Sequence, residues 1–230
     1  MAKFKQITHV IFDMDGVILD SEPLYTKAIQ NIVGKYGKTF TWDVKNAMMG
    51  LNRIDGSQFI VERLQLPITW EEYDAVIQEE YKLVLADPPV FPGAQKLIKH
   101  LHKHNIPISV ATSSSQDSFD LKAAKYKDLF SLFDHIVCGG SDPDVKEGKP
   151  APDIFRVSAT RFPDKPKPEK CLVFEDAPNG VQAALAAGMQ VVMVPDENTP
   201  LESRKNATLV VTSIDETPLE KFGLPPLRID

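Results

Sequence analysis

Five short apolar runs recur along the chain, and most of them stop abruptly at polar residues or a proline. They are His9–Phe12 before Asp13, Pro107–Ala111 before Thr112, His135–Cys138, Leu172–Phe174 before Glu175, and Gln190–Val194 before Pro195. Runs of this length predict strands that are buried on both faces. The stretches between them carry apolar residues at helical spacing, as at Ala94, Leu97, Ile98 and Leu101. This alternation predicts an α/β fold, a Rossmann-like, doubly wound parallel sheet.

Between the first strand and residue 87 the chain shows only helical patterns. Apolar or aromatic residues recur every four positions along the first helix, at Leu24, Ala28, Ile32 and Tyr36. Thr41 can cap a second helix, and Thr69 with Glu72 forms a capping box before another. Two consecutive prolines then break the pattern. We therefore expect an all-helical cap domain at residues 21–87, inserted into a core of residues 1–20 and 88–230.

The composition excludes several classes of protein. The chain has 230 residues, of which 43% are hydrophobic and 25% charged, as in ordinary globular proteins. A net charge of −6 gives no reason to expect a nucleic acid polymer or an anionic membrane as partner. Cys138 and Cys171 lack metal-site spacing, and neither a signal peptide nor a membrane-spanning run is evident. We expect a cytoplasmic monomer.

Polar residues suited to metal and phosphate binding follow four of the predicted strands. They are Asp13 and Asp15 after the first, Thr112 and Ser113 after the second, Lys149 after the third, and Glu175 and Asp176 after the fourth. Parallel strands present their carboxyl ends at one edge of the sheet, so these residues should converge. Gathered carboxylates repel one another unless a cation neutralises them, and Mg²⁺ with phosphate oxygens and water suits this set. The pattern indicates phosphoryl transfer.

Each motif taken alone has a simpler explanation. The Asp-x-Asp-Gly sequence at 13–16 could be a turn or part of a calcium loop, although Leu24 stands where such a loop needs its twelfth-position glutamate. Glu175 and Asp176 could cap a helix, and Lys149 could be solvated. The four motifs in order favour the catalytic interpretation.

The same residues resemble the four motifs of the haloacid dehalogenase-like phosphatases. The likeness rests on Asp13-Met-Asp-Gly16, Thr112, Gly148-Lys149-Pro150 and Glu175-Asp176, and it spans nearly the whole chain. It implies a Mg²⁺-dependent phosphomonoesterase with a helical cap, acting on a small phosphorylated metabolite.

The resemblance also implies a role for each residue. Asp13 would be the nucleophile that forms an aspartyl phosphate, and Asp15 the general acid and base. Thr112, Ser113 and Lys149 would bind the phosphate. The metal would be held by Asp13, the backbone carbonyl of Asp15, and Asp176, with Glu175 either as an auxiliary ligand or as a residue that positions the metal and its waters without binding it.

Within the family, the likeness is greatest to the pseudouridine-5′-phosphatase branch, through Thr41–Lys45, Ala111–Ser114 and Lys170–Gly180. Specificity would lie in the cap segment that contains Gly50, Asn52 and Arg53, although Arg53 could equally be an exposed residue at a helix start.

Other functions stay open. A sugar-phosphate or glycerol-phosphate phosphatase is the main alternative. A hexose-phosphate mutase is less favoured, because Tyr25 stands where such mutases carry a cap histidine, and a non-catalytic binding module is disfavoured because Asp13 and Asp15 are both present.

Overall fold

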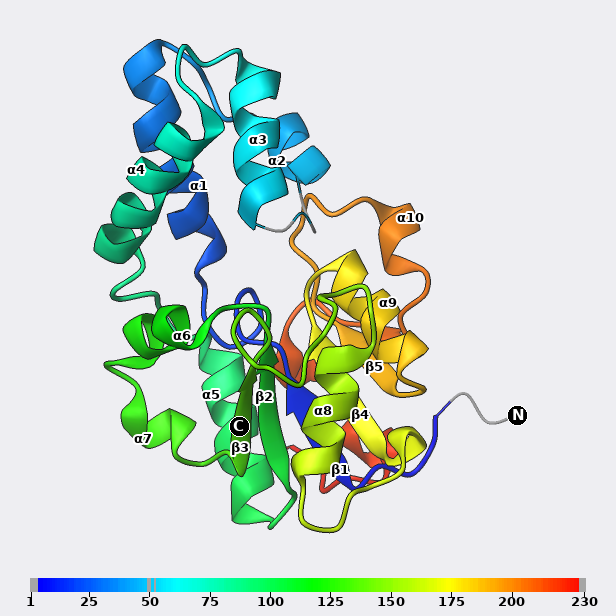
Figure 1. The fold of residues 1–230 in the computed structure, drawn as a ribbon. Helices are drawn as coiled ribbons and strands as arrows, with labels where there is room; N and C mark the ends of the chain where they lie inside the picture. The colour runs from blue at the N-terminus through cyan, green and yellow to red at the C-terminus, as the bar shows by residue number, and fades with distance from the viewer. Residues whose placement is uncertain (1–3, 49–50, 52, 228–230) are drawn as a thin grey trace. The chain divides into compact units, whose positions relative to one another are not determined.

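The computed structural model describes residues 4–48, 51 and 53–227. The chain divides into two compact units (Figure 1), which we call the core unit, residues 1–19 and 90–230, and the cap unit, residues 20–89. No helix within the described residues is long and apolar enough to cross a membrane.

The core unit is built on a six-stranded, fully parallel sheet in the order β3-β2-β1-β4-β5-β6. The strands are β1 (His9–Phe12), β2 (Ile108–Thr112), β3 (His135–Cys138), β4 (Cys171–Glu175), β5 (Gln190–Met193) and β6 (Leu209–Val210). The strand order reverses at β1, which lies between β2 and β4. Ligands of doubly wound sheets bind at the carboxyl ends of the strands that flank such a reversal.

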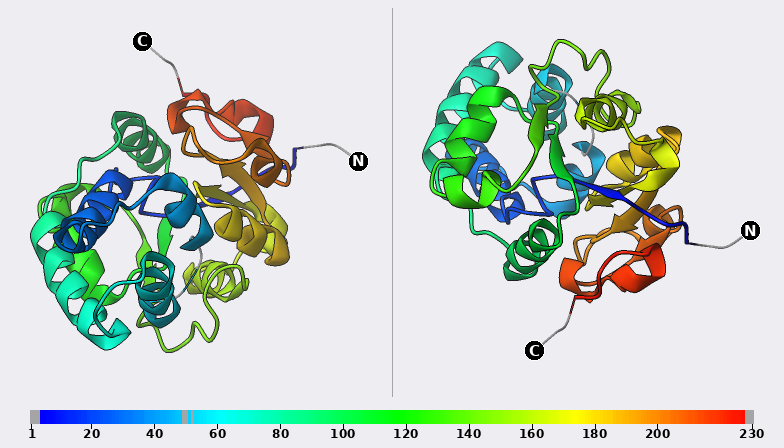
Figure 2. Two further views of the ribbon diagram at one scale, coloured as in Figure 1. Left: turned by 90° about the horizontal axis from the view of Figure 1, so that it is seen from above. Right: turned by 90° about the horizontal axis from the view of Figure 1, so that it is seen from below.

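Helices cover both faces of this sheet (Figures 1 and 2). One face carries α5 (Pro92–Lys103), α6 (Gln116–Ala123) and α7 (Lys127–Phe130), and the other carries α8 (Asp153–Arg161) and α9 (Pro178–Ala186). The short elements are η2 (Pro168–Lys170), α10 (Leu201–Arg204), η3 (Ile214–Glu216) and η4 (Leu219–Phe222). On β1, Val10 and Phe12 pack against the face covered by α5, α6 and α7, and Ile11 packs against the face covered by α8 and α9. Successive side chains of a strand alternate in direction. The doubly wound fold expected from the sequence is confirmed, and β6 is a strand that the pattern did not predict.

Within its described residues the cap unit contains helices and connecting turns but no strand. Its elements are α1 (Glu22–Val33), η1 (Gly34–Tyr36), α2 (Trp42–Met48), α3 (Arg53–Leu64) and α4 (Trp70–Val84). The capping box is present: Thr69 Oγ1 accepts from the Glu72 amide, and the Glu72 carboxylate accepts from the Thr69 amide. The prediction that Tyr36 continues the apolar face of the first helix was wrong. The α-helix ends at Val33 and Tyr36 is 36% exposed, since a 3₁₀ turn leads to left-handed Gly37.

The two segments that connect the units are hydrogen-bonded to each other. Leu19 and Val90 form an antiparallel bridge, and the Phe91 amide donates to the Ile18 carbonyl at 3.0 Å. On the cap side, the Asp20 amide donates to the Pro89 carbonyl at 2.8 Å. The chain therefore leaves the core and re-enters it through adjacent segments.

Candidate active site

The loop after β1 begins at the reversal point of the sheet and turns back tightly on itself. The amides of Ile18 and Leu19 both donate to the Met14 carbonyl at 2.9 Å, and the Gly16 amide donates to the Leu19 carbonyl. Gly16 has a φ of 83°, a conformation that glycine adopts without strain. This turn fixes the backbone on which Asp13 and Asp15 stand.

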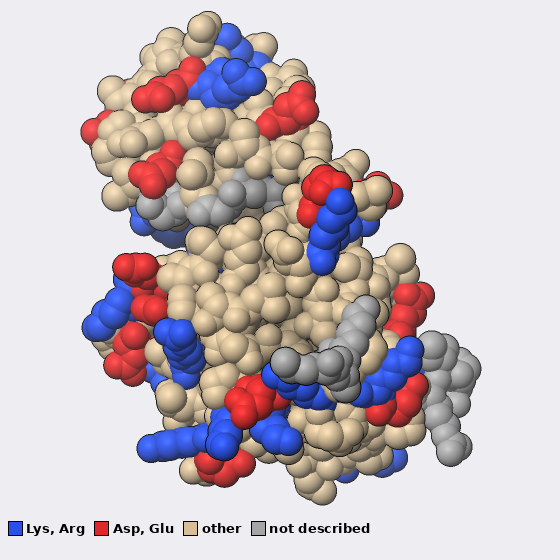
Figure 3. All heavy atoms as spheres, turned by 90° about the vertical axis from the view of Figure 1, so that its right-hand side faces the viewer, with Lys and Arg blue, Asp and Glu red and all other residues tan. Residues whose placement is uncertain are grey.

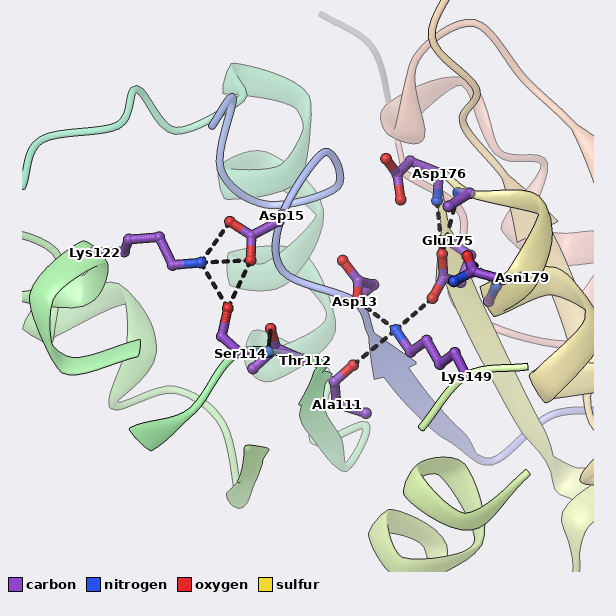
Figure 4. Close-up of polar contacts among 12 residues, drawn as sticks. Asp13, Asp15, Ala111, Thr112, Ser114, Lys122, Lys149, Glu175, Asp176 and Asn179 are labelled. Carbon is purple, nitrogen blue, oxygen red and sulfur yellow. Dashed lines mark hydrogen bonds and ion pairs between the residues drawn. The ribbon is translucent and has the colours of Figure 1, made fainter. Parts of the chain in front are cut away.

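Asp13 lies in an ion pair with Lys149, whose side chain is 4% exposed. The Lys149 Nζ donates to Asp13 Oδ1 at 2.5 Å, to Glu175 Oε1 at 2.5 Å and to the Ala111 carbonyl at 3.3 Å (Figure 4). Residues from three strand ends and from the loop that precedes α8 thus meet at one ammonium group.

Burial and charge act in opposite directions on these groups. Burial raises the pKa of Asp13 to about 7; Lys149 lowers it, whereas Glu175 and Asp15 raise it. Burial lowers the pKa of Lys149, but Asp13 and Glu175 outweigh that effect and hold the pKa above its usual value. Lys149 therefore stays charged at the centre of the site.

Glu175 ends β4 and connects it to α9. One carboxylate oxygen accepts from Lys149, and the other accepts from the amides of Asp176 at 3.1 Å and Ala177 at 3.2 Å. A side chain at Gly180 would collide with this carboxylate, because a Cβ there would lie 1.9 Å from its carbon. Glycine in the first turn of α9 is what allows Glu175 to be enclosed.

Asp176 lies against the loop that carries Asp13 and Asp15. A Cβ on Gly16 would lie 2.2 Å from Asp176 Oδ2, so the absence of a side chain at Gly16 makes room for this carboxylate. Four carboxylates, those of Asp13, Asp15, Glu175 and Asp176, are thus opposed by two ammonium groups in this part of the core unit.

The donor atoms fit Mg²⁺ in a limited way. Among the described residues, no three acidic, histidine or cysteine side chains converge on one metal position. The Asp15 carboxylate is turned toward Lys122, and that of Glu175 toward Lys149 and the α9 amides. The carboxylates of Asp13 and Asp176 are oxygen donors of the type that Mg²⁺ takes, one or two at a time, together with water and phosphate oxygens.

The phosphate-binding candidates at the end of β2 differ in exposure. Thr112 is 1% exposed, and its Oγ1 accepts from the Ser114 amide at 3.1 Å, whereas the Ser113 side chain is exposed. Figure 4 shows Thr112 next to Ser114.

Comparison with known proteins assigns this arrangement to a family. Residues 7–188 match the family model described as haloacid dehalogenase-like hydrolase. The chain belongs to this hydrolase family.

Two relatives and one solved structure illustrate the likeness. The chain is 48% identical over 221 residues to a "Probable pseudouridine-5′-phosphatase" of Drosophila melanogaster, covering 96% of each protein. It is 44% identical to (DL)-glycerol-3-phosphatase 2 of Arabidopsis thaliana, covering 96% of this chain and 93% of the relative. The crystal structure of HAD hydrolase, family IA, variant 3 from Entamoeba histolytica matches with a TM-score of 0.75 at 27% identity, covering 94% of this chain and 97% of the other. The chain is accordingly a phosphoric monoester hydrolase.

In this hydrolase, the predicted cap residues are only partly described. Gly50 and Asn52 lie outside the described residues. Arg53 begins α3, and its guanidinium donates to both oxygens of Asp74 on α4 at 2.5–3.1 Å. Ser57 Oγ donates to the same carboxylate at 3.2 Å. Within the cap unit, Arg53 thus joins two helices.

Tyr25 packs edge-to-face on Tyr81.

One residue of this hydrolase was missed by sequence reasoning. Lys122 on α6 is fully buried, and its Nζ donates to both oxygens of Asp15 at 2.7 and 2.6 Å and to Ser114 Oγ at 2.8 Å. The signal was present, because Phe119, Lys122 and Ala123 share the inward face of α6. A lysine at a core position of a helix indicates a buried partner.

Proposed function

We propose that the chain is a Mg²⁺-dependent phosphomonoesterase that works through an aspartyl phosphate on Asp13. The observation that carries the proposal is the Asp13 carboxylate held by Lys149 at the reversal point of the sheet. A carboxylate in such a place can attack phosphorus and divide one difficult displacement into two steps. Membership of the hydrolase family supports the same chemistry.

The neighbouring residues take complementary roles. Lys149 neutralises charge on the transferring phosphoryl group, and Thr112 with the Ser113 amide binds its other oxygens. Asp15 protonates the leaving oxygen and then activates the water that hydrolyses the aspartyl phosphate.

The carboxylates of Asp13 and Asp176 and the Asp15 carbonyl would hold Mg²⁺. When bound, the ion supplies positive charge beside the phosphate and orients it toward Asp13. Glu175 supports this group indirectly, since it fixes Lys149 and the amides that follow β4.

We further propose pseudouridine 5′-phosphate as the preferred substrate. The support is the 48% identity to a protein of that name and the Thr41–Lys45 segment in the cap. Pseudouridine joins its base through carbon, so its ring presents an N–H that uridine lacks. A buried acceptor left unpaired by the wrong base could supply about 1–3 kcal/mol, or roughly ten- to a hundredfold in rate ratio. Asn52 can accept such a bond, whereas Arg53 can only donate.

The second candidate is a glycerol-phosphate phosphatase, which is favoured by a 44% identity that also spans 96% of the chain. The core residues serve either substrate, because they meet only the phosphate.

The kcat/KM for pseudouridine 5′-phosphate, uridine 5′-phosphate, glycerol 3-phosphate and hexose phosphates at fixed Mg²⁺ separates the candidates. We expect kcat/KM for pseudouridine 5′-phosphate to exceed that for uridine 5′-phosphate at least about tenfold. Equal values for the two nucleotides, or a preference for glycerol 3-phosphate, would overturn the substrate while leaving the phosphatase chemistry intact.

We propose a monomer that acts on small phosphorylated metabolites rather than on polymers or membranes. On the face shown in Figure 3, basic and acidic side chains are interspersed in small groups, in keeping with the net charge of −6.

A further inference from the structure

Among its described residues, the core unit contains the enclosed ammonium groups of Lys122 and Lys149, and the proposed chemistry uses only that of Lys149. Lys149 meets Asp13 and Glu175, whereas Lys122 meets Asp15 and Ser114 on the other side of the β1 loop (Figure 4). Lys122 is fully buried and comes from α6, which carries none of the motif residues. A buried ammonium is costly to desolvate, so its partners indicate what it does.

The contacts of Lys122 occupy all the donors of its ammonium group. An ammonium has three N–H donors, and here two acceptors are the Asp15 oxygens and the third is Ser114 Oγ. Ser114 Oγ in turn donates to Asp15 Oδ2 at 3.1 Å. These contacts join Lys122 to the carboxylate of Asp15 and to the Ser114 hydroxyl.

Helix α6 holds this ammonium in a fixed place. Ser115 caps the helix directly after Ser114, so the turn that places Ser114 also starts the helix that carries Lys122. Phe119 and Ala123, on the same helical face, pack into the core layer that covers the sheet. The anchor for Asp15 is thus built entirely from the core unit.

We propose that Lys122 is a positioning residue, which with Ser114 fixes the orientation of the Asp15 carboxylate for proton transfer to the leaving oxygen. Proton transfer requires hydrogen-bond reach and alignment, and a misplacement of about 1 Å can cost about a hundredfold in rate. A carboxylate held at both oxygens cannot rotate freely about its terminal bond. This inference rests on the role proposed for Asp15.

The test is Lys122→Met, which keeps the length of the side chain and removes its charge. The substrates are an alkyl ester, either glycerol 3-phosphate or pseudouridine 5′-phosphate, whichever turns over faster, and p-nitrophenyl phosphate, whose leaving group needs no proton. We expect kcat/KM for the alkyl ester to fall about ten- to a hundredfold. For p-nitrophenyl phosphate the fall should be at least about fivefold smaller, because proton transfer contributes little there.

Controls separate positioning from a purely structural role. Lys127→Met, at an exposed position on α7, should leave kcat/KM for both esters unchanged. An equal loss on both esters, or no loss on the alkyl ester, would overturn the proposal. If Lys122→Met does not fold, Ser114→Ala takes its place, and we expect kcat/KM to fall about three- to tenfold for the alkyl ester alone. An unchanged kcat/KM for the alkyl ester would then overturn the proposal.

Asp15→Asn distinguishes this inference from the proposed function. If Asp15→Asn is severely impaired on the alkyl ester while Lys122→Met is not, only the positioning role fails. If Asp15→Asn retains full activity on that ester, the role of Asp15 itself is wrong, and the positioning role fails with it.

Discussion

The core unit encloses the ion pairs of Lys122 and Lys149, although others such as Lys205–Glu202 are exposed, whereas the Arg53–Asp74 pair of the cap unit is partly exposed. In the core, the Lys122 side chain is fully buried and that of Lys149 is 4% exposed, and both meet carboxylates from distant parts of the chain. In the cap, Arg53 is 62% exposed in its pair with Asp74, and Lys45, which is 13% exposed, meets a Glu22 side chain that is 35% exposed. Exposed pairs contribute little to stability, whereas enclosed charges are costly and persist where chemistry needs them. The difference predicts that losing an enclosed core charge lowers both catalysis and the free energy of unfolding, and that losing the exposed Arg53 charge lowers the free energy of unfolding little.

The largest expected effect is that of Asp13→Asn. We expect turnover to fall at least about 10⁴-fold with the fold retained, because an amide cannot serve as the attacking oxygen. Phosphate release measures the activity, and far-UV circular dichroism verifies the fold. A folded variant within tenfold of the parent would show that Asp13 is not the nucleophile.

Removal of the metal comes next. Chelation should lower activity about 10²- to 10³-fold, and Mg²⁺ should restore it. Ca²⁺ should not restore it, because its longer and less regular coordination misplaces phosphate and nucleophile. Full activity in the presence of chelator would refute the metal site. Urea denaturation with and without Mg²⁺ provides a second readout, since a ligand that binds only the folded core should raise its stability.

The contrast in depth is tested most directly by Lys149→Met against Arg53→Met. We expect Lys149→Met to lower the free energy of unfolding by about 3–5 kcal/mol, because Asp13 and Glu175 then lose their enclosed counter-ion. Arg53→Met should cost no more than about 1 kcal/mol.

The chain offers a convenient way to measure the two units separately. Both of its tryptophans, Trp42 and Trp70, lie in the cap unit, so their fluorescence follows the cap while circular dichroism follows the whole chain. Lys149→Met should shift the circular dichroism transition and spare the fluorescence transition. If Lys149→Met and Arg53→Met lowered the free energy of unfolding equally, the predicted difference between enclosed core charges and exposed cap charges would be wrong.

The smallest effect concerns pH. Burial lowers the pKa of His135 from its ordinary value of 6.5, although its Nε2–H donates to the Ser158 carbonyl at 2.9 Å. As the pH falls, His135 is therefore protonated in the unfolded chain before it is protonated in the folded one. Neutral His135 thus contributes its full stabilisation above about pH 6.5, and this contribution is lost as the pH falls toward the folded pKa.

We expect the stability of the core to decline between pH 7 and 5, and to decline less in His135→Gln. The cap unit contains no histidine, so the tryptophan transition should hardly move over this range. Urea titrations at several pH values measure both signals. A steeper decline in the variant would contradict the assignment.

The sequence was most informative about features that depend on local pattern. Strand positions, the helices that follow the first strand and the capping box at Thr69 all follow from periodicity and cap chemistry. The meeting of Asp13, Lys149 and Glu175 could also be anticipated, because parallel strands end at a common edge.

Partners far apart in sequence could not be predicted in the same way. Lys122 meets Asp15 across 107 positions, and Arg53 meets Asp74 across 21. The periodicity of α6 places Lys122 on its inward face, but nothing local to either helix identifies the carboxylate that Lys122 or Arg53 meets. The two-residue strand β6 is too short to show alternation. These features depend on how the elements pack, which local pattern does not specify.

The paired segments at Ile18–Leu19 and Val90–Phe91 have an evolutionary consequence. Because the chain leaves and re-enters the core through adjacent, hydrogen-bonded segments, a recombination event that replaces residues 20–89 keeps both breakpoints in register. Descendants could acquire a foreign cap by one exchange while the phosphate chemistry passes on unaltered. Chimeras made at these two breakpoints would show whether substrate preference is inherited with the cap.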